Sequence, residues 1–332
     1  YGLNNEMGGI QGEDGEMMFN YNNNAIQGIP QTIKTGIYYT DKVTKNTKLN
    51  FNYSYNNNQL NAKSETNSQY FLTDTSYSTV NTIQSLQKNE AHNVNLGFEQ
   101  KIDSLADLTF KSNIKFLNNS TNTINETGFI ADDNFKTRST NLTSNNKGNG
   151  YDISNNLRLN KRFMKKDRIL NVTYSNNFTN NTTDGFLKTD NEFFTTSTQT
   201  ITSVNQKKSN LANSQNHSAG FSFTEPITKK IKVELSYDYM FLNSKQDKKS
   251  LNNIGGEYNL IDSSLTNNFV NKKQTNRGGL KFIYEVKKIR FTLGSKVRNV
   301  FVHNDNLFKK QIITQNFTNI LPFSTLRYKF TD

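Results

Sequence analysis

The feature of this chain that most limits its fold is a stretch of eleven residues, 231–241, in which apolar and polar side chains alternate. In an extended strand, successive side chains point to opposite faces, so one face of this segment is apolar and the other is polar. The apolar face carries Ile231, Val233, Leu235, Tyr237, Tyr239 and Phe241. A tilted strand needs roughly 9 to 11 residues to cross a hydrocarbon core, whereas a globular strand usually ends near 5 or 6. The segment therefore predicts a strand that runs through a membrane between lipid and water.

The same alternation recurs in segments that pair across short polar turns near Val43, Leu105, Lys165, Thr228 and Lys288. A hairpin therefore repeats about every 60 residues, which is the mark of an internal repeat. The predicted strands are 33–40 with 48–56, 92–101 with 108–118, 152–161 with 168–178, 217–224 with 231–241, 277–286 with 289–301, and a further strand from 325 to 330. Other residues predicted to face lipid are Leu49, Phe51, Tyr53, Leu170, Val172 and Tyr174. The repeat predicts an all-β fold, an antiparallel up-and-down transmembrane β-barrel of which about eleven strands are visible.

Long polar stretches separate the hairpins, at 57–91, 119–150, 180–216, 243–276 and 302–319. Connections of this length are uncommon in a compact soluble domain. We expect them to be long extracellular loops, with the short turns on the periplasmic side. Aromatic residues such as Tyr55, Phe178 and Phe301 lie at the long-loop end of their strands. An aromatic girdle at the membrane interface explains this placement, although aromatic residues are also common in any β-strand.

Composition agrees with a barrel and excludes several other classes. Only 33% of the residues are hydrophobic but 12% are aromatic, and disordered chains are poor in aromatic residues. No apolar run is long enough for a transmembrane helix, and the absence of cysteine excludes disulfides and thiolate sites. The net charge of +12 could suit nucleic acid, but the basic residues form no single stripe, so no nucleic-acid partner is expected. We expect a Gly/Asn-rich loop over 1–30 and the barrel segment over 31–332.

The sequence predicts no catalytic residue, no metal and no cofactor. The three histidines, His92, His217 and His303, lie far apart and lack further ligands at metal-binding spacing, so we read them as polar residues at the barrel rim. No Gly-x-Ser-x-Gly motif occurs, and we expect the protein not to be an enzyme.

Aromatic residues within the polar stretches are the candidate contacts for an external ligand. Exposed rings in polar loops can stack on sugars or close over a ligand. Short hairpins within the loops that bury these rings are the alternative explanation. The residues concerned are Tyr70, Phe71, Tyr77, Phe193 and Phe194.

Several turns and strands resemble those of the TonB-dependent receptor-like outer-membrane β-barrel family of Bacteroidota. The segments that carry the resemblance are 28–41, 98–105, 224–229, 233–237, 319–323 and 328–330. The resemblance implies a barrel of roughly 22 strands whose lumen is filled by an N-terminal plug domain. No plug is recognisable in these residues, and an odd strand number does not close in the usual antiparallel way. We therefore expect this chain to be an interior segment of such a barrel in the bacterial outer membrane.

Three functions are compatible with these residues. The first is an outer-membrane receptor that takes up an external ligand, with outer-membrane lipid around it and TonB acting through a plug domain outside this chain. The second is a structural or assembly barrel that docks partner proteins such as surface lipoproteins. The third is a secreted soluble β-rich adhesin, which requires a second sheet to bury the apolar faces. Fold-level likeness alone does not decide among them.

Overall fold

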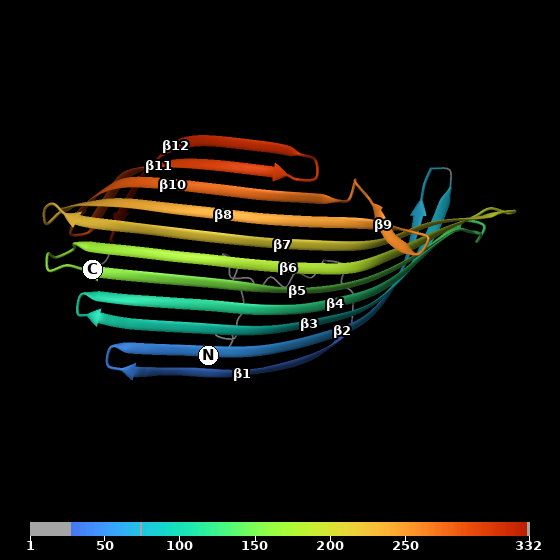
Figure 1. Ribbon diagram of the computed structural model, residues 1–332, viewed down its shortest axis with the longest axis horizontal. Coiled ribbons are helices and arrows are strands. Elements are labelled where there is room, and N and C mark those ends of the chain that lie inside the picture. Colours follow the sequence, from blue (N-terminus) through green and yellow to red (C-terminus); the bar gives the residue numbers. More distant parts are fainter. Residues whose placement is uncertain (1–27, 74, 331–332) are drawn as a thin grey trace.

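The computed structural model describes residues 28–73 and 75–330, and these residues form one large antiparallel sheet. In sequence order the strands run up and down, each hydrogen-bonded to the next, except that the short β9 pairs only with β8 (Figure 1). The strands are β1 (Gly28–Thr44), β2 (Thr47–Phe71), β3 (Ser76–Asp103), β4 (Ala106–Ala131), β5 (Lys136–Arg162), β6 (Ile169–Phe194), β7 (Gln199–Pro226), β8 (Ile231–Ile254), β9 (Glu257–Ile261), β10 (Asn267–Val286), β11 (Ile289–Asn306) and β12 (Gln311–Tyr328).

The predicted fold class and the predicted positions of the short turns are confirmed. The described strands form an all-β, up-and-down sheet, and eleven of them lie on its main path, as expected. Short connections join the strands at each of the five predicted turns. The turn between β10 and β11 is only two residues long, and Lys287 has a positive φ of 43° there. Such a conformation is typical of tight hairpin turns.

The predicted long loops are wrong, because those stretches continue the strands. Residues 57–91, for example, form the outer half of β2, a short connection, and the first part of β3, which pair without a break from Thr47↔Gln100 to Phe71↔Ser76. Strands such as β3 and β7 reach 28 residues. At about 3.3 Å per residue they are roughly 90 Å long, several times what the hydrocarbon core requires. The outer halves of the strands have water on both faces, so their apolar and polar residues need not alternate. The alternating pattern that predicted the inner halves is therefore absent from the outer halves.

Two smaller predictions at the chain ends are also corrected. Residues 325–328 do not begin a new strand, because they are the last residues of β12. The expected loop over 1–30 lies mostly outside the described residues, and its last three residues belong to β1.

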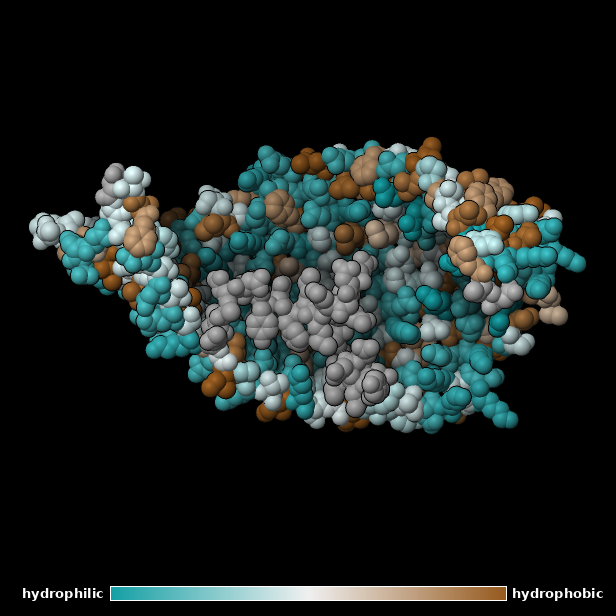
Figure 2. Space-filling model, turned by 180° about the vertical axis from the view of Figure 1, so that it is seen from behind, coloured by the Kyte–Doolittle hydropathy of each residue, from teal (hydrophilic) through white to brown (hydrophobic). Residues whose placement is uncertain are grey.

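The sheet curves around a hollow, and no described element packs against either of its faces. All substantial contacts between strands are between hydrogen-bonded neighbours. Figure 2 shows the concave face, whose visible parts around the hollow are mostly hydrophilic. β1 and β12 each pair on one side only within the described residues, so closure of the barrel is not seen.

Candidate functional site: a membrane-facing band and a polar concave face

The residues predicted to face lipid share the convex face of the sheet. Leu235 lies opposite Phe223 on β7 and Leu280 on β10, and 52% of its surface is exposed. Such exposure of a large apolar residue within a regular sheet indicates a surface made for an apolar solvent. On β8 the predicted set alternates with Lys232, Glu234 and Asp238, which take the concave face. Contact of these side chains with lipid itself stays a prediction.

The strand pairing joins these residues into one continuous apolar band. Residues that are opposite each other in neighbouring strands point to the same side of a sheet. The predicted residues of β2 and β6 therefore continue the band through apolar partners on β3 and β7. These pairs are Leu49↔Phe98, Phe51↔Leu96, Tyr53↔Val94, Leu170↔Phe223, Val172↔Phe221 and Tyr174↔Ala219.

Tyrosine and histidine side chains form hydrogen-bonded pairs at the outer edge of the band. The Tyr53 hydroxyl lies 2.9 Å from Nδ1 of His92, and the Tyr174 hydroxyl lies 2.9 Å from Nδ1 of His217. The Tyr237 hydroxyl donates to Oδ1 of Asn276 at 2.7 Å. A ring with one apolar and one hydrogen-bonded end suits the boundary between hydrocarbon and headgroups. The third histidine, His303, also lies at this rim, with Nδ1 3.1 Å from Oγ1 of Thr314.

An ion-pair cluster lies at the opposite rim, at the short-turn end of the strands, which we expect to be periplasmic. Arg168 donates two hydrogen bonds to the carboxylate of Glu225, at 2.6 and 2.8 Å, and Lys165 donates a third at 2.6 Å. The two-pronged bond from Arg168, followed by that from Lys165, lowers the pKa of Glu225 from 4.5 to about 2. The cluster fastens the β5–β6 connection to the end of β7 beyond the apolar band.

The concave face is mostly polar, although Leu60, Ile283 and Val300 are buried on it. Asn52, Ser54 and Asn93 are buried on this face, where Asn93 Nδ2 donates to Ser54 Oγ at 3.3 Å. Farther along the sheet, Asn177 Nδ2 donates to Asp152 at 3.0 Å. Polar side chains hydrogen-bonded to one another across strands are expected on the wall of a wet lumen.

Cations outnumber carboxylates on the concave face of β8, β10, β11 and β12. Lys281 pairs with Glu234 at 2.7 Å, and Arg277 pairs with Asp238 at 2.9 Å. No described carboxylate forms an ion pair with the remaining cations on the concave face of β10, β11 and β12. The register places these on the same face: Lys273, Arg290, Lys296, Arg298 and Arg327. Sequence reasoning found no such cluster, because the cations are scattered along the chain.

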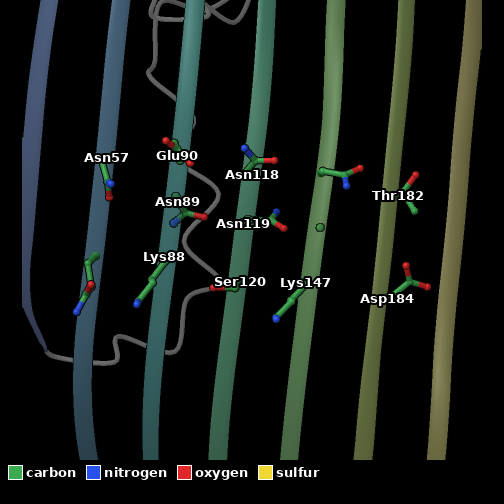
Figure 3. Close-up of a pocket in the computed structure, with 13 residues that line it drawn as sticks. Asn57, Lys88, Asn89, Glu90, Asn118, Asn119, Ser120, Lys147, Thr182 and Asp184 are labelled. Carbon is green, nitrogen blue, oxygen red and sulfur yellow. The ribbon is translucent and has the colours of Figure 1, made fainter.

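A polar hollow of about 640 Å³ lies on the convex face above the aromatic rim, where the strands continue into water. Figure 3 shows Lys88, Lys147 and Asp184 among the amide, hydroxyl and carboxylate side chains that line it. Neither lysine has an ion-pair partner among the described residues. Five adjacent strands, from β2 to β6, contribute side chains, so the hollow is a property of the extended ribbons. Its donors and acceptors suit a hydroxylated or polar protein surface.

The candidate ligand contacts lie at the tips of the ribbons. The rings of Tyr70 and Tyr77 stack across the β2–β3 hairpin at 4.8 Å between centroids, while Phe71 next to them is 77% exposed. At the next tips, the guanidinium of Arg138 lies 5.3 Å from the ring of Phe193. The ammonium of Lys136 lies 5.5 Å from the ring of Phe194. These residues thus lie in hairpins, but the hairpins do not bury Tyr70, Phe71 and Phe193 as the alternative explanation requires. A role in ligand contact stays a prediction.

The described residues show neither a metal-binding cluster nor a helical membrane span. No group of three or more His, Cys, Asp or Glu side chains in this part of the chain is placed to hold a metal ion. None of the described residues forms a helix that is long and apolar enough to cross a membrane.

Residues 161–332 match the model of the outer membrane protein beta-barrel family. The chain belongs to this family. Its place is therefore the outer membrane, and membrane lipid covers the outside of its wall. This location excludes the soluble adhesin, and the second sheet that the adhesin requires is not found among the described residues.

Two solved structures of outer-membrane proteins are similar to this barrel-family chain. One is the ferric citrate transporter FecA in its unliganded form, with 11% identity, a TM-score of 0.38, and coverage of 92% of this chain and 42% of the transporter. The other is the outer membrane protease OmpT from Escherichia coli, with 7% identity, a TM-score of 0.24, and coverage of 87% and 98%. The chain thus spans less than half of the transporter's length. No curated protein matches the chain.

Proposed function

We propose that this chain is part of the wall of an outer-membrane uptake receptor, and that it carries no catalytic activity of its own. The observation that supports the proposal most is the contrast between the two faces of one sheet. An apolar band on the convex face and a polar, cation-rich hollow on the concave face are what a wall between lipid and a solute pathway requires. The ribbons beyond the membrane add a surface on which an external ligand can first be captured.

The unpaired edges support a barrel larger than these strands. In lipid, each unpaired backbone group costs several kcal/mol, so a membrane sheet has no free edge. We therefore propose that further strands pair with β1 and β12 in the whole protein. A barrel of roughly 22 strands encloses a lumen wide enough for a plug domain. We propose that TonB acts on this plug domain to open the pathway.

The test is ligand-dependent contact between the full-length protein and TonB in living cells. A photo-crosslinking residue is placed in the periplasmic N-terminal segment of the full-length protein, ahead of the proposed plug domain, and crosslinked TonB is measured with growth medium that supplies or lacks candidate nutrients. Crosslinking that rises with one nutrient, together with uptake that stops when the proton-motive force is removed, is the expected result. A full-length protein without a lumen-filling domain would refute the TonB coupling.

A second candidate function is docking of partner proteins such as surface lipoproteins. The polar hollow around Lys88 and Lys147 favours it, because it lies on the convex side of rigid ribbons and not toward the lumen. Stable partners that copurify in mild detergent, and that are lost in Lys88→Gln and Lys147→Gln, would support docking. Lys34→Gln on β1, which does not line the hollow, is the matched control. Partners that resist both lysine substitutions would argue against docking at this hollow.

A further inference from the structure

On the concave face of β7, β8, β10 and β11, a small hollow of about 200 Å³ brings several cations together. Arg277 and Arg298 lie directly opposite each other on β10 and β11. Lys273 lines the same hollow, together with Thr275 and Asp238. Like charges directly opposite each other in a sheet destabilise it unless something of opposite charge lies between them.

The single carboxylate among the residues that line the hollow is paired with one of the arginines. Oδ2 of Asp238 accepts a hydrogen bond from Nε of Arg277 at 2.9 Å and forms an ion pair with Nη2 of Arg277 at 2.9 Å. Gly220 on β7 lets Asp238 approach, because a Cβ at this glycine would lie only 2.7 Å from Oδ1 of Asp238. Asp238 therefore holds Arg277 in place and leaves the charge of Arg298 unbalanced.

Two donors in the hollow are buried and have no hydrogen-bond partner in the described part of the chain. They are Nε of Arg298 and Oγ1 of Thr275. A buried polar atom without a partner costs about 1–3 kcal/mol, and more when it is charged, so two such donors in one hollow call for an explanation, and a bound ion supplies one. Arg298, Lys273 and Thr275 together offer a guanidinium, an ammonium and a hydroxyl, which is the donor set that oxyanions require.

We infer that this hollow is an anion-binding site on the lumen wall, and that it takes a phosphate or carboxylate group of a solute. The inference rests on the proposed uptake function for its biological meaning, since it names an anionic solute as the class of cargo. Binding itself depends only on the hollow. Arg298 and Lys273 contact the anion, while Asp238 positions Arg277 beside it.

The test is binding of inorganic phosphate to the full-length protein in detergent micelles, measured by titration calorimetry at low ionic strength. Arg298→Gln and Lys273→Gln each remove one charge and should raise the dissociation constant at least about tenfold. Arg298→Lys keeps the charge and should recover part of the affinity. Arg158→Gln is the matched control, because Arg158 has the same charge, lies on the concave face of β5 and does not line the hollow. Heat-dependent mobility on gels verifies that each variant is folded.

Each other outcome overturns the inference. Absence of saturable phosphate binding, or an equal loss in Arg158→Gln, means that the hollow is no specific anion site. If phosphate does not bind and Arg298→Gln instead lowers the melting temperature, a carboxylate from another segment of the protein occupies the hollow. The calorimetry uses neither TonB nor energised cells. Saturable phosphate binding, combined with failure of TonB-dependent uptake in cells, would therefore refute the proposed function and leave this site standing.

Discussion

Neighbouring side chains on β8 point to opposite faces of the sheet, one expected to contact lipid and the other water. The effect of a substitution on stability therefore depends on the face that carries it. Leu235 is on the convex face, which we expect to contact lipid, and Ser236 after it is on the concave face between Glu234 and Asp238. A charge on the first face must enter hydrocarbon, whereas a charge on the second face meets water and two carboxylates.

Leu235→Arg should destabilise the folded protein by about 2–4 kcal/mol, the cost of arginine near the centre of a bilayer. Ser236→Arg should cost less than about 1 kcal/mol, because its side chain stays in the wet hollow. Urea unfolding of the full-length protein in lipid vesicles measures both free energies. Equal costs for the two variants would contradict the assignment of the convex face to lipid.

The cluster at the periplasmic rim predicts a defined pH dependence. The folded-state pKa of Glu225 is about 2, below its ordinary value of 4.5, so ionised Glu225 stabilises the folded state. Its contribution is present in full above about pH 4.5 and is lost as the pH falls through about 2. Glu225→Gln removes this contribution at every pH. The difference in melting temperature between wild type and Glu225→Gln should thus be constant from pH 7 to 5 and vanish toward pH 2. A difference that stays constant down to pH 2 would disprove the pairing with Arg168 and Lys165.

Part of the concave cluster was within reach of the sequence. The turn at 287–288 was predicted, and a two-residue turn pairs residues at equal distances on its two sides, so Arg277 and Arg298 had to face each other. The contact between Arg277 and Asp238 was not predictable in this way. It depends on the pairing of β8 with β10, which are joined through β9 and connections whose register the local sequence does not fix.

The strands themselves were predictable only where two solvents meet. Inside the bilayer, alternation follows from lipid on one side and water on the other, and the inner halves of β2 to β8 show it. Beyond the bilayer, Asn and Thr side chains pair across strands on both faces, as in the hydrogen bond from Thr127 to Asn81 at 2.9 Å. Because turn residues and strand residues are equally polar there, composition alone favoured loops.

Trypsin on intact cells distinguishes ribbons from loops. Lys309 and Lys310 lie in the exposed connection between β11 and β12, and Lys310 has a positive φ of 52°. Lys88 and Lys147 lie within paired strands of the outer halves. Cleavage should therefore occur first after Lys309 or Lys310, and Lys88 and Lys147 should be cut much more slowly, because proteases need locally extended and unpaired backbone. Peptide mass spectrometry over a time course gives the order, and rapid early cleavage at Lys88 would restore the loop interpretation.

The molecule as a whole is a single curved layer, and its stability in the membrane depends on what covers its two ends. The edge strands are rich in exposed apolar residues, among them Ile33 and Ile37 on β1 and Ile320 and Leu326 on β12. Such edges are ready to pair with other strands.

Hydrogen exchange on the full-length protein in lipid nanodiscs tests the closure of the sheet. If further strands pair with both edges, the amides of the membrane halves of β1 and β12 should be protected as strongly as those of the interior strand β5. Deuterium uptake followed by mass spectrometry compares the three strands within one sample. Fast exchange confined to β1 and β12 would mean that the edges stay unpaired.

The ribbon of β2 and β3 is one unbroken strand pair from Thr47↔Gln100 at its turn end to Phe71↔Ser76 at its outermost tip. A hinge requires a break in the hydrogen-bond ladder, and this pair has none along its length. A ligand or partner that binds at Tyr70 and Tyr77 therefore contacts the end of a rigid two-stranded ribbon. A force applied at the tip therefore tilts and twists the whole sheet, including the part of the strands that lies within the membrane.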